Sequence, residues 1–173
     1  MKTIYIALAA VLLVVATLLF SHFFLKVPPK ATDETSFNNE FSLVLKDYPG
    51  NDVHLYSFRR QVLVAYTWAS WCTYCADELR HLAELKKTYG DKIQILAINR
   101  AEPLQSAKDF TDKLDTGSNI TLLLDPKDAF FKSIAGYAMP ETVFIDAGGN
   151  IVYHQRGPID MPTLEEKMKE LVR

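Results

Sequence analysis

The stretch Val64-Ala-Tyr-Thr-Trp-Ala-Ser-Trp-Cys72-Thr-Tyr-Cys75 changes its hydrophobic pattern part of the way along. Residues 61–67 form a short, nearly continuous apolar run, which is typical of a strand covered on both faces of a sheet. From Cys75 to Tyr89 apolar residues recur at steps of three and four and end before Gly90, which predicts one face of a helix. The only two cysteines of the chain therefore lie at a strand-to-helix junction, with Cys72 at the start of the helix.

The spacing of these two cysteines predicts thiol-disulfide exchange. Backbone N–H groups at the start of a helix and the positive end of its dipole favour a thiolate, so we expect Cys72 to be the nucleophile. Cys75 lies one turn further on, within the apolar stripe, where it is shielded and close enough to resolve a mixed disulfide. A structural crosslink is not indicated, because a loop this short constrains little of the unfolded chain.

Length and composition limit the remaining possibilities. A chain of 173 residues has room for one domain and a short appendage. Its content of 49% hydrophobic and 23% charged residues excludes a disordered or collagen-like protein. A net charge of -2 does not provide the basic surface that nucleic acids need, so we expect no nucleic-acid partner.

The N-terminus has the pattern of a membrane anchor. Residues 4–25 contain no Asp, Glu, Lys or Arg, and a helix of this length spans about 33 Å, enough for a hydrocarbon core of about 30 Å. A cleaved secretory signal is the alternative, but residues 25–30 offer no small-x-small cleavage site. We expect a single-pass transmembrane helix at residues 1–26, a tether at 27–39 and a globular domain at 40–173. The flanking lysines do not decide its orientation.

Strands and helices alternate along the domain, which predicts an α/β fold with a central mixed sheet and helices on both faces. Asp125 is expected to be the N-cap of a short helix, with Pro126 as its first residue. The expected strands lie at residues 41–46, 53–56, 61–67, 92–98, 120–124, 142–145 and 151–153, and the expected helices at residues 75–89, 103–114, 126–134 and 162–172.

Two segments resemble the thioredoxin-like superfamily. Residues 64–75 are similar to its active-site segment, and Ala138-Met-Pro140-Glu-Thr-Val-Phe-Ile-Asp146 is similar to its cis-proline segment. Within the superfamily, the N-terminal anchor, an extra helix-strand unit at residues 103–124 and the Pro-Glu-Thr run resemble the tethered TlpA, ResA and CcmG (DsbE) group. The resemblance covers residues 40–172 and implies a thioredoxin-like fold.

The resemblance also implies a place and a function. Such proteins are bacterial, are held in the cell membrane with the soluble domain on the extracytoplasmic side, and mostly reduce disulfides in cytochrome c maturation. The implied partners are disulfide-bearing proteins, such as apocytochrome c or its maturation factors, and a membrane electron donor of the CcdA or DsbD type. We expect a monomer that needs no cofactor and no metal.

The residues that match the family motifs are the expected site. Cys72 matches the nucleophilic cysteine and Cys75 the resolving one, and the bond between Met139 and Pro140 is expected to be cis. In the family this proline loop pairs with the backbone of the substrate. Glu78 matches an acidic position that is thought to tune the thiols or move protons. Its alternative role is that of a carboxylate that merely favours the helix dipole.

Three further residues are expected to contact the substrate: Trp71, Tyr74 and Met139. Tyr74 is also a departure, because most relatives have proline before the second cysteine. Tyr66 is another, since it stands where thioredoxin has a buried acid, six residues before the first cysteine. Because Tyr66 replaces the buried acid, that route for proton transfer is absent, and Glu78 becomes a more interesting candidate for the role.

Two alternatives remain at this point. The same residues would serve a disulfide oxidase or a general repair reductase, because the direction of exchange follows the redox potentials of the pair and its partners. A Sco-like copper-binding protein is the other, since two thiolates and the imidazole of His154 would suit Cu(I). Those copper-delivery proteins separate their cysteines by three residues rather than two, which weighs against the second alternative.

Overall fold

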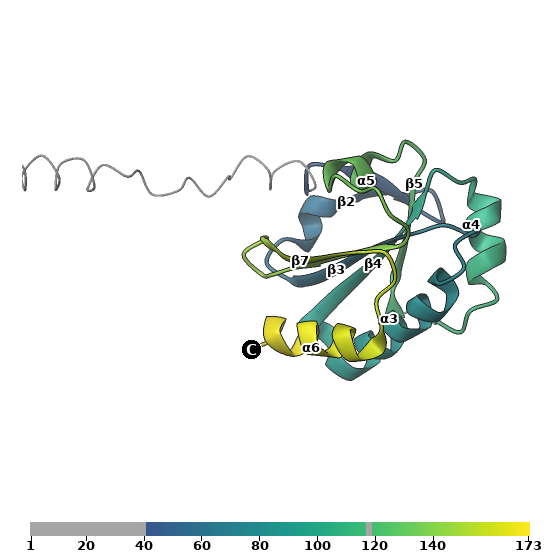
Figure 1. Ribbon diagram of the computed structural model, residues 1–173. Coiled ribbons are helices and arrows are strands. Elements are labelled where there is room, and N and C mark those ends of the chain that lie inside the picture. The colour runs from purple at the N-terminus through teal and green to yellow at the C-terminus, as the bar shows by residue number, and fades with distance from the viewer. Residues whose placement is uncertain (1–40, 117–118) are drawn as a thin grey trace, which may run out of the picture. The chain divides into compact units, whose positions relative to one another are not determined.

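The computed structural model describes residues 41–116 and 119–173 (Figure 1). The predicted anchor at residues 1–26 and the predicted tether at residues 27–39 lie outside the described residues. Within the described part of the chain, no helix is long and apolar enough to cross a membrane. The anchor and the tether therefore stay predictions.

A mixed sheet of seven strands forms the centre of the described domain. The strands are β1 (Val44–Asp47), β2 (Asp52–His54), β3 (Val62–Trp68), β4 (Ile93–Arg100), β5 (Thr121–Asp125), β6 (Glu141–Ile145) and β7 (Ile151–Arg156). Their order is β2-β1-β5-β4-β3-β6-β7, in which β4 pairs parallel with both β3 and β5 and every other pair is antiparallel. The predicted α/β fold with a mixed sheet is confirmed.

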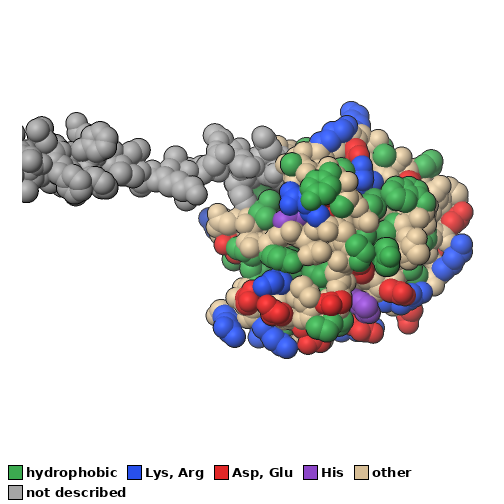
Figure 2. Space-filling view, viewed as in Figure 1, with side chains coloured by type: hydrophobic (Ala, Val, Ile, Leu, Met, Phe, Trp, Pro, Cys, Tyr) green, Lys and Arg blue, Asp and Glu red, His purple; other side chains and the backbone are tan. Residues whose placement is uncertain are grey.

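Helices cover both faces of this sheet. They are α3 (Cys75–Tyr89), α4 (Leu104–Thr111), α5 (Ala129–Ser133) and α6 (Met161–Leu171). Figure 1 shows α3 and α6 together on one side of the sheet and α5 on the other. Figure 2 shows basic and acidic side chains interspersed with hydrophobic ones over the visible face.

The side chains of β3 alternate between the two hydrophobic clusters under these helices. Val64, Tyr66 and Trp68 pack in the cluster that contains the buried residues of α3, α4 and α6. Leu63 and Ala65 pack in the other cluster, which contains Phe130 of α5. Because successive residues of a strand point to opposite faces, an uninterrupted apolar strand is what a sheet covered on both sides requires.

The N-terminal hairpin is shorter than predicted. Its second strand, β2, ends at His54, and Leu55–Phe58 form the 3₁₀ helix η1 instead of continuing the strand to residue 56. The Ser57 hydroxyl donates a hydrogen bond of 2.7 Å to the His54 carbonyl. Local bonds of this kind compete with strand pairing, which explains the early end. A second 3₁₀ helix, η2 (Gly90–Lys92), follows α3.

The start of α5 also differs from the prediction. The helix begins at Ala129, and Pro126 lies in the turn before it. Asp128, at φ 58°, is the residue before the helix, but its side chain makes no cap bond. The buried Asp125 carboxylate instead accepts the N–H groups of Ala129 at 2.9 Å and Phe130 at 2.7 Å. Asp125 therefore accepts hydrogen bonds from the first N–H groups of α5, although a turn separates it from the helix and it is not the adjacent N-cap residue.

Replacing this carboxylate tests its contribution to the fold. Asp125→Ala should lower the free energy of unfolding by about 1–3 kcal/mol, because two N–H groups at the helix start lose their acceptor. Urea unfolding of the oxidised protein, followed by tryptophan fluorescence, measures the change. Asp109→Ala, in which an exposed carboxylate on α4 is removed, is the control and should change it by less than about 0.5 kcal/mol. Equal effects of the two substitutions would contradict the assignment.

Candidate active site

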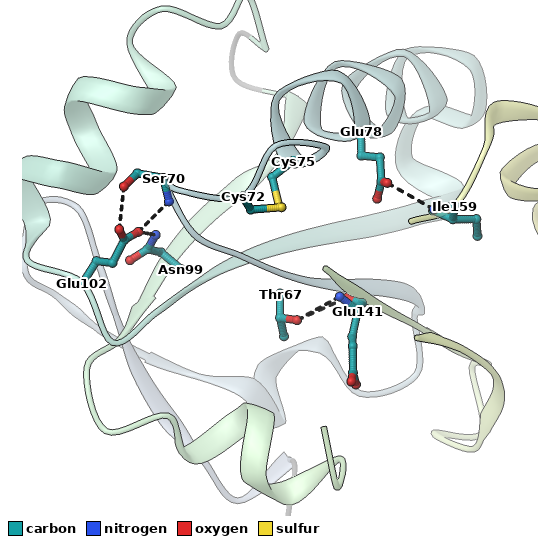
Figure 3. The surroundings of a disulfide bond; sticks show 9 residues. All are labelled: Thr67, Ser70, Cys72, Cys75, Glu78, Asn99, Glu102, Glu141 and Ile159. Carbon is teal, nitrogen blue, oxygen red and sulfur yellow. Dashed lines mark hydrogen bonds between the residues drawn. A yellow bond between two sulfur atoms is a disulfide. The ribbon is translucent and has the colours of Figure 1, made fainter. Parts of the chain in front are cut away.

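A disulfide joins Cys72, in the connection between β3 and α3, to Cys75, the first residue of α3 (Figure 3). Their Cα atoms are 5.4 Å apart. Cys72 retains 7% of its accessible surface, whereas Cys75 is completely buried among the side chains that underlie α3. The two sulfurs therefore differ in access, and Cys72 is the one nearer to solvent.

Helix α3 begins at Cys75 and not at Cys72, which corrects the prediction that Cys72 starts the helix. The Cys72 N–H donates to the Ala69 carbonyl at 3.1 Å, and the Cys75 N–H donates to the Cys72 carbonyl at 3.3 Å. Both bonds span three residues and make turns, so the chain passes through a tight loop before the helix begins. Tyr74 is the N-cap residue and provides no side-chain cap. Cys72 accordingly lies in the turn that leads into the helix.

The segment before β6 lies beside this loop. The bond between Met139 and Pro140 is cis, as predicted, and Pro140 is buried. The register of β3 with β6 places Thr67 opposite Glu141, and the Thr67 hydroxyl lies 3.2 Å from the Glu141 nitrogen. Met139 is half-buried against the cluster that contains both cysteines. The segment at residues 134–140, before β6, is the proline loop, and residues 69–74, between β3 and α3, are the redox loop. The two loops are thus neighbours at one edge of the sheet.

Glu141 holds the proline loop by its own side chain. Although it is completely buried, its Oε1 accepts the N–H groups of Tyr137 and Ala138, both at 2.7 Å. Its Oε2 lies 2.7 Å from His154 Nε2. Burying a carboxylate is costly unless it is hydrogen-bonded, and here both oxygens have partners. The sequence prediction missed this role, although a charged residue at the start of an apolar strand is a signal for it.

The partner of His154 weakens the copper alternative. Its Nε2 faces the Glu141 carboxylate rather than a cysteine. Over residues 41–116 and 119–173, no group of three or more His, Cys, Asp or Glu side chains is placed to hold a metal ion. The copper-binding interpretation needs the His154 imidazole as a ligand. In this structure the imidazole instead contacts Glu141, the carboxylate that holds the proline loop.

Glu78 lies on α3, one turn after Cys75, and points toward the start of α6. It is 4% exposed, and its Oε1 accepts the Ile159 N–H at 3.1 Å (Figure 3). Burial raises the pKa of Glu78 to about 7, while the Ile159 N–H and the Tyr66 hydroxyl lower that pKa by less. The bond to Ile159 shows that Glu78 packs against another segment and is not a freely solvated helix carboxylate.

Tyr66, on β3, interacts electrostatically with Glu78. Burial, followed by the Glu78 charge, raises the pKa of the Tyr66 hydroxyl well above its usual range. Neither Tyr66 Oη nor Glu78 Oε2 has a hydrogen-bond partner among the described residues. One carboxylate oxygen of Glu78 is therefore uncommitted and close to a neutral phenol.

A pocket of about 310 Å³ opens next to Glu78. It is lined by Tyr74, Asp77, Glu78, His81, Pro158, Ile159 and Asp160. The pocket joins the start of α3 to the segment before α6, so the buried carboxyl group has a route toward solvent.

Exposed aromatic side chains lie close to Cys72 in the sequence, one directly before it and one between the two cysteines. Trp71 is 66% exposed and Tyr74 is 58% exposed, and both flank Cys72. Tyr137, in the proline loop, is 78% exposed and has the Arg156 guanidinium 5.1 Å from its ring centre. Trp68, by contrast, is completely buried and stacks on Phe110 at 5.3 Å. Tyr137 is an exposed aromatic of the site that the sequence prediction missed.

A third carboxylate lies on the other side of the redox loop in the view of Figure 3. Glu102 accepts hydrogen bonds from both the N–H and the hydroxyl of Ser70, and from the Asn99 amide. Ser70 and Glu102 are 32 positions apart in the chain, so no local spacing indicated this contact.

Comparison with known proteins gives a consistent result. The Redoxin family model matches residues 30–171. Thiol-disulfide oxidoreductase ResA from Geobacillus kaustophilus is 25% identical over 129 residues, which are 74% of this chain and 73% of that protein. Thiol:disulfide interchange protein DsbE from Allochromatium vinosum is 29% identical over 152 residues, which are 85% of this chain and 78% of that protein. Among solved structures, MTB DsbF in its mixed oxidized and reduced forms matches with a TM-score of 0.71 and 20% identity, covering 77% of this chain and 97% of that chain.

The match to a solved structure and the matches to named relatives support different statements about this chain. The likeness to DsbF, at 20% identity, concerns the fold alone, and it confirms the thioredoxin-like arrangement. ResA and DsbE carry names of thiol-disulfide exchange proteins, and the expected resemblance to them is confirmed. Since the family match spans most of the sequence and includes the disulfide and the proline loop, the chain belongs to the Redoxin family and is a thioredoxin-like thiol-disulfide oxidoreductase.

Proposed function

We propose that the protein is a membrane-tethered, extracytoplasmic reductase of protein disulfides in which Cys72 attacks and Cys75 resolves. The observation that carries the proposal is the unequal access of the two bonded sulfurs beside the proline loop. An attacking sulfur has to reach a bulky partner, whereas a resolving sulfur has to reach only its neighbour.

The exchange proceeds in two balanced steps. The Cys72 thiolate attacks one sulfur of the partner's disulfide, which forms a mixed disulfide and releases the other partner sulfur as a thiolate that takes up a proton. Cys75 then loses its proton and attacks the Cys72 sulfur, which closes the Cys72–Cys75 disulfide and releases the second partner thiol. The partner gains two electrons and the protein loses two, so an electron donor has to reduce the pair again.

Glu78 is proposed to accept the proton that Cys75 loses. With a pKa raised to about 7 by burial, it exists in both protonation states near neutral pH, which suits a group that takes up and returns protons. Its Oε2 has no hydrogen-bond partner among the described residues and is available for that exchange. The pocket beside it supports the return of the proton to solvent.

Trp71, Tyr74 and Met139 are proposed to contact the partner protein. The two aromatic side chains are exposed on the redox loop, and Met139 precedes the proline whose loop pairs with an extended substrate segment in related proteins. Exposed aromatics next to a reactive group are suited to binding, because they bury a large area with little loss of side-chain freedom. Tyr137 extends this surface.

The tether and the pathway rest on the sequence and the relatives. The uncharged run at residues 4–25 supports a single-pass anchor at residues 1–26, with the domain joined to it by residues 27–39. The similarity to ResA and DsbE supports an extracytoplasmic role in cytochrome c maturation, with apocytochrome c or a maturation factor as substrate. A membrane protein of the CcdA or DsbD type is the proposed donor.

Replacement of the resolving cysteine tests the division of roles. Cys75→Ser should leave Cys72 able to attack, so that partners accumulate as mixed disulfides, whereas Cys72→Ser should trap none. Expression of each variant in the full chain, followed by non-reducing electrophoresis and mass spectrometry of the captured proteins, makes the comparison. Capture of apocytochrome c or a maturation factor supports the proposed pathway. Equal capture by the two variants would show that Cys72 is not the attacking sulfur.

The pH dependence of exchange tests Glu78. Because only its deprotonated form accepts a proton, the single-turnover rate of the reduced protein with a protein disulfide should rise as the pH increases through about 7. Glu78→Gln should remove this inflection and slow the reaction by about 10- to 100-fold at pH 8. Asp77→Asn, which removes an exposed carboxylate from the same helical turn, is the matched control and should keep the inflection. A Glu78→Gln variant with the original profile would refute the role.

Stability gives an independent check on Glu78. The folded protein holds the Glu78 proton up to about pH 7, whereas the ordinary pKa of the group is 4.5. The native state thus binds more protons between these values, and its stability should fall as the pH rises through that range. Glu78→Gln removes this loss and should be more stable than the natural protein at pH 8, by about 1–3 kcal/mol, but not at pH 4. Urea unfolding at both pH values measures the difference.

A further inference from the structure

The Glu102 carboxylate is attached to the redox loop by an unusual set of donors. Its Oε2 accepts the Ser70 N–H at 2.8 Å and the Asn99 amide at 2.7 Å, and its Oε1 accepts the Ser70 hydroxyl at 2.5 Å (Figure 3). Both oxygens of the carboxylate are therefore used, and two of the three bonds go to one residue, which lies two positions before Cys72. The Glu102 carboxylate thus holds Ser70 through both the backbone N–H and the side-chain hydroxyl of that residue.

The sheet brings Glu102 to this position. Strands β3 and β4 run parallel with Trp68 opposite Asn99, so the loop after β3 and the loop after β4 leave the same edge. After β4 the chain turns at Ala101, which has φ 48°, in the left-handed region that favours glycine. The Ala101 N–H is held by the Asp125 carbonyl at 3.0 Å. This turn places the Glu102 side chain against Ser70.

The donors around Glu102 are all neutral. Within the described ranges, no lysine, arginine or histidine forms an ion pair with it. A carboxylate accepts hydrogen bonds and donates none, so it matches three converging donors. Two of these donors share Oε2 and the Ser70 hydroxyl bonds to Oε1, so both carboxylate oxygens take part in holding the loop. The site therefore fits a side chain that accepts hydrogen bonds at two oxygens.

Other contacts already hold helix α4, which follows Glu102. Phe110 of α4 stacks on the buried Trp68, and Thr111 at its end lies 3.2 Å from the Tyr48 hydroxyl, between the two side-chain oxygens. Ala107 and Thr111 are themselves buried. The bonds to Ser70 are thus not needed to attach α4 to the sheet. These bonds instead restrain the redox loop, in which Ser70 lies.

We propose that Glu102 is a positioning residue for thiol-disulfide exchange: it fixes Ser70 and thereby the turn that presents Cys72. The Cys72 N–H bonds to the Ala69 carbonyl within that same turn, so Ser70 lies inside the segment whose geometry sets the position of the sulfur. Trp71 is two-thirds exposed and does not hold the loop by packing. The proposal rests on exchange at Cys72 and does not depend on the direction of electron flow or on the identity of the partner.

The rate of attack on a small disulfide tests the proposal without a protein partner. The full chain is reduced, and its second-order rate constant with oxidised glutathione is measured at pH 7. Glu102→Ala should lower this rate constant by about tenfold, because the loop loses all three bonds to the side chain and Cys72 spends less time in the reactive position. Glu84→Ala, which removes an exposed carboxylate from α3, is the control and should stay within about twofold of the natural protein.

Two substitutions at Ser70 separate positioning from general destabilisation. Ser70→Thr keeps the N–H and the hydroxyl and should retain the natural rate constant, whereas Ser70→Ala loses one of the bonds and should lower it by about threefold. All rates are taken at a temperature at which circular dichroism shows each variant to be fully folded. A purely structural role would lower the unfolding temperature and leave these rates unchanged.

The possible outcomes are distinct. Folded Glu102→Ala with a rate constant within twofold of the natural protein overturns the proposal. If that variant does not fold, Ser70→Ala decides: an unchanged rate constant overturns the proposal, and a decrease that Ser70→Thr does not share supports it. Failure of the natural protein to react with oxidised glutathione would count against Cys72 as the nucleophile, and would be visible before any variant is compared.

Discussion

The site depends on the pairing of β3 with two different strands. Because β3 lies between β4 and β6, the loop that follows it leaves the sheet between the end of one strand and the beginning of the other. Both ladders extend to its last residues, with Trp68 opposite Asn99 and Thr67 opposite Glu141. The loop that contains Cys72 is consequently flanked on both sides by backbone whose position is already set by hydrogen bonds.

Three carboxylates then hold the loops at this end of the molecule. Glu78, Glu102 and Glu141 each accept a backbone N–H: from Ile159, from Ser70 and from the proline loop, respectively. The three carboxylates differ in their remaining hydrogen bonds. Both oxygens of Glu102 and of Glu141 have partners, which suits them to holding backbone in place. Glu78 keeps one oxygen without a partner among the described residues, and burial raises its pKa to about 7, which suits it to proton transfer.

Local patterns predicted the elements better than their ends. The apolar run of β3, the stripe of α3 and the C-x-x-C pair are visible in neighbouring residues, as is the proline segment with its cis bond. The predicted bounds of α3 are confirmed, but the placement of Cys72 at the start of α3 and of Asp125 as the N-cap of α5 is wrong, for one physical reason. At both Cys72 and Asp125 a turn bonded across three residues precedes the first helical residue, and sequence periodicity does not distinguish such a turn from a helical one.

The sequence by itself determined the order of strands and helices, the redox pair and the proline beside it, because hydrophobic period and short motifs act between neighbouring residues. Only the tertiary structure decided that Glu102 holds Ser70 and that His154 belongs to Glu141. The bond to Ser70 joins residues 32 positions apart that meet through parallel strand pairing, and the contact of Glu141 with His154 crosses a strand pair. Such partners follow from the strand order and register, which the residues around each carboxylate do not encode.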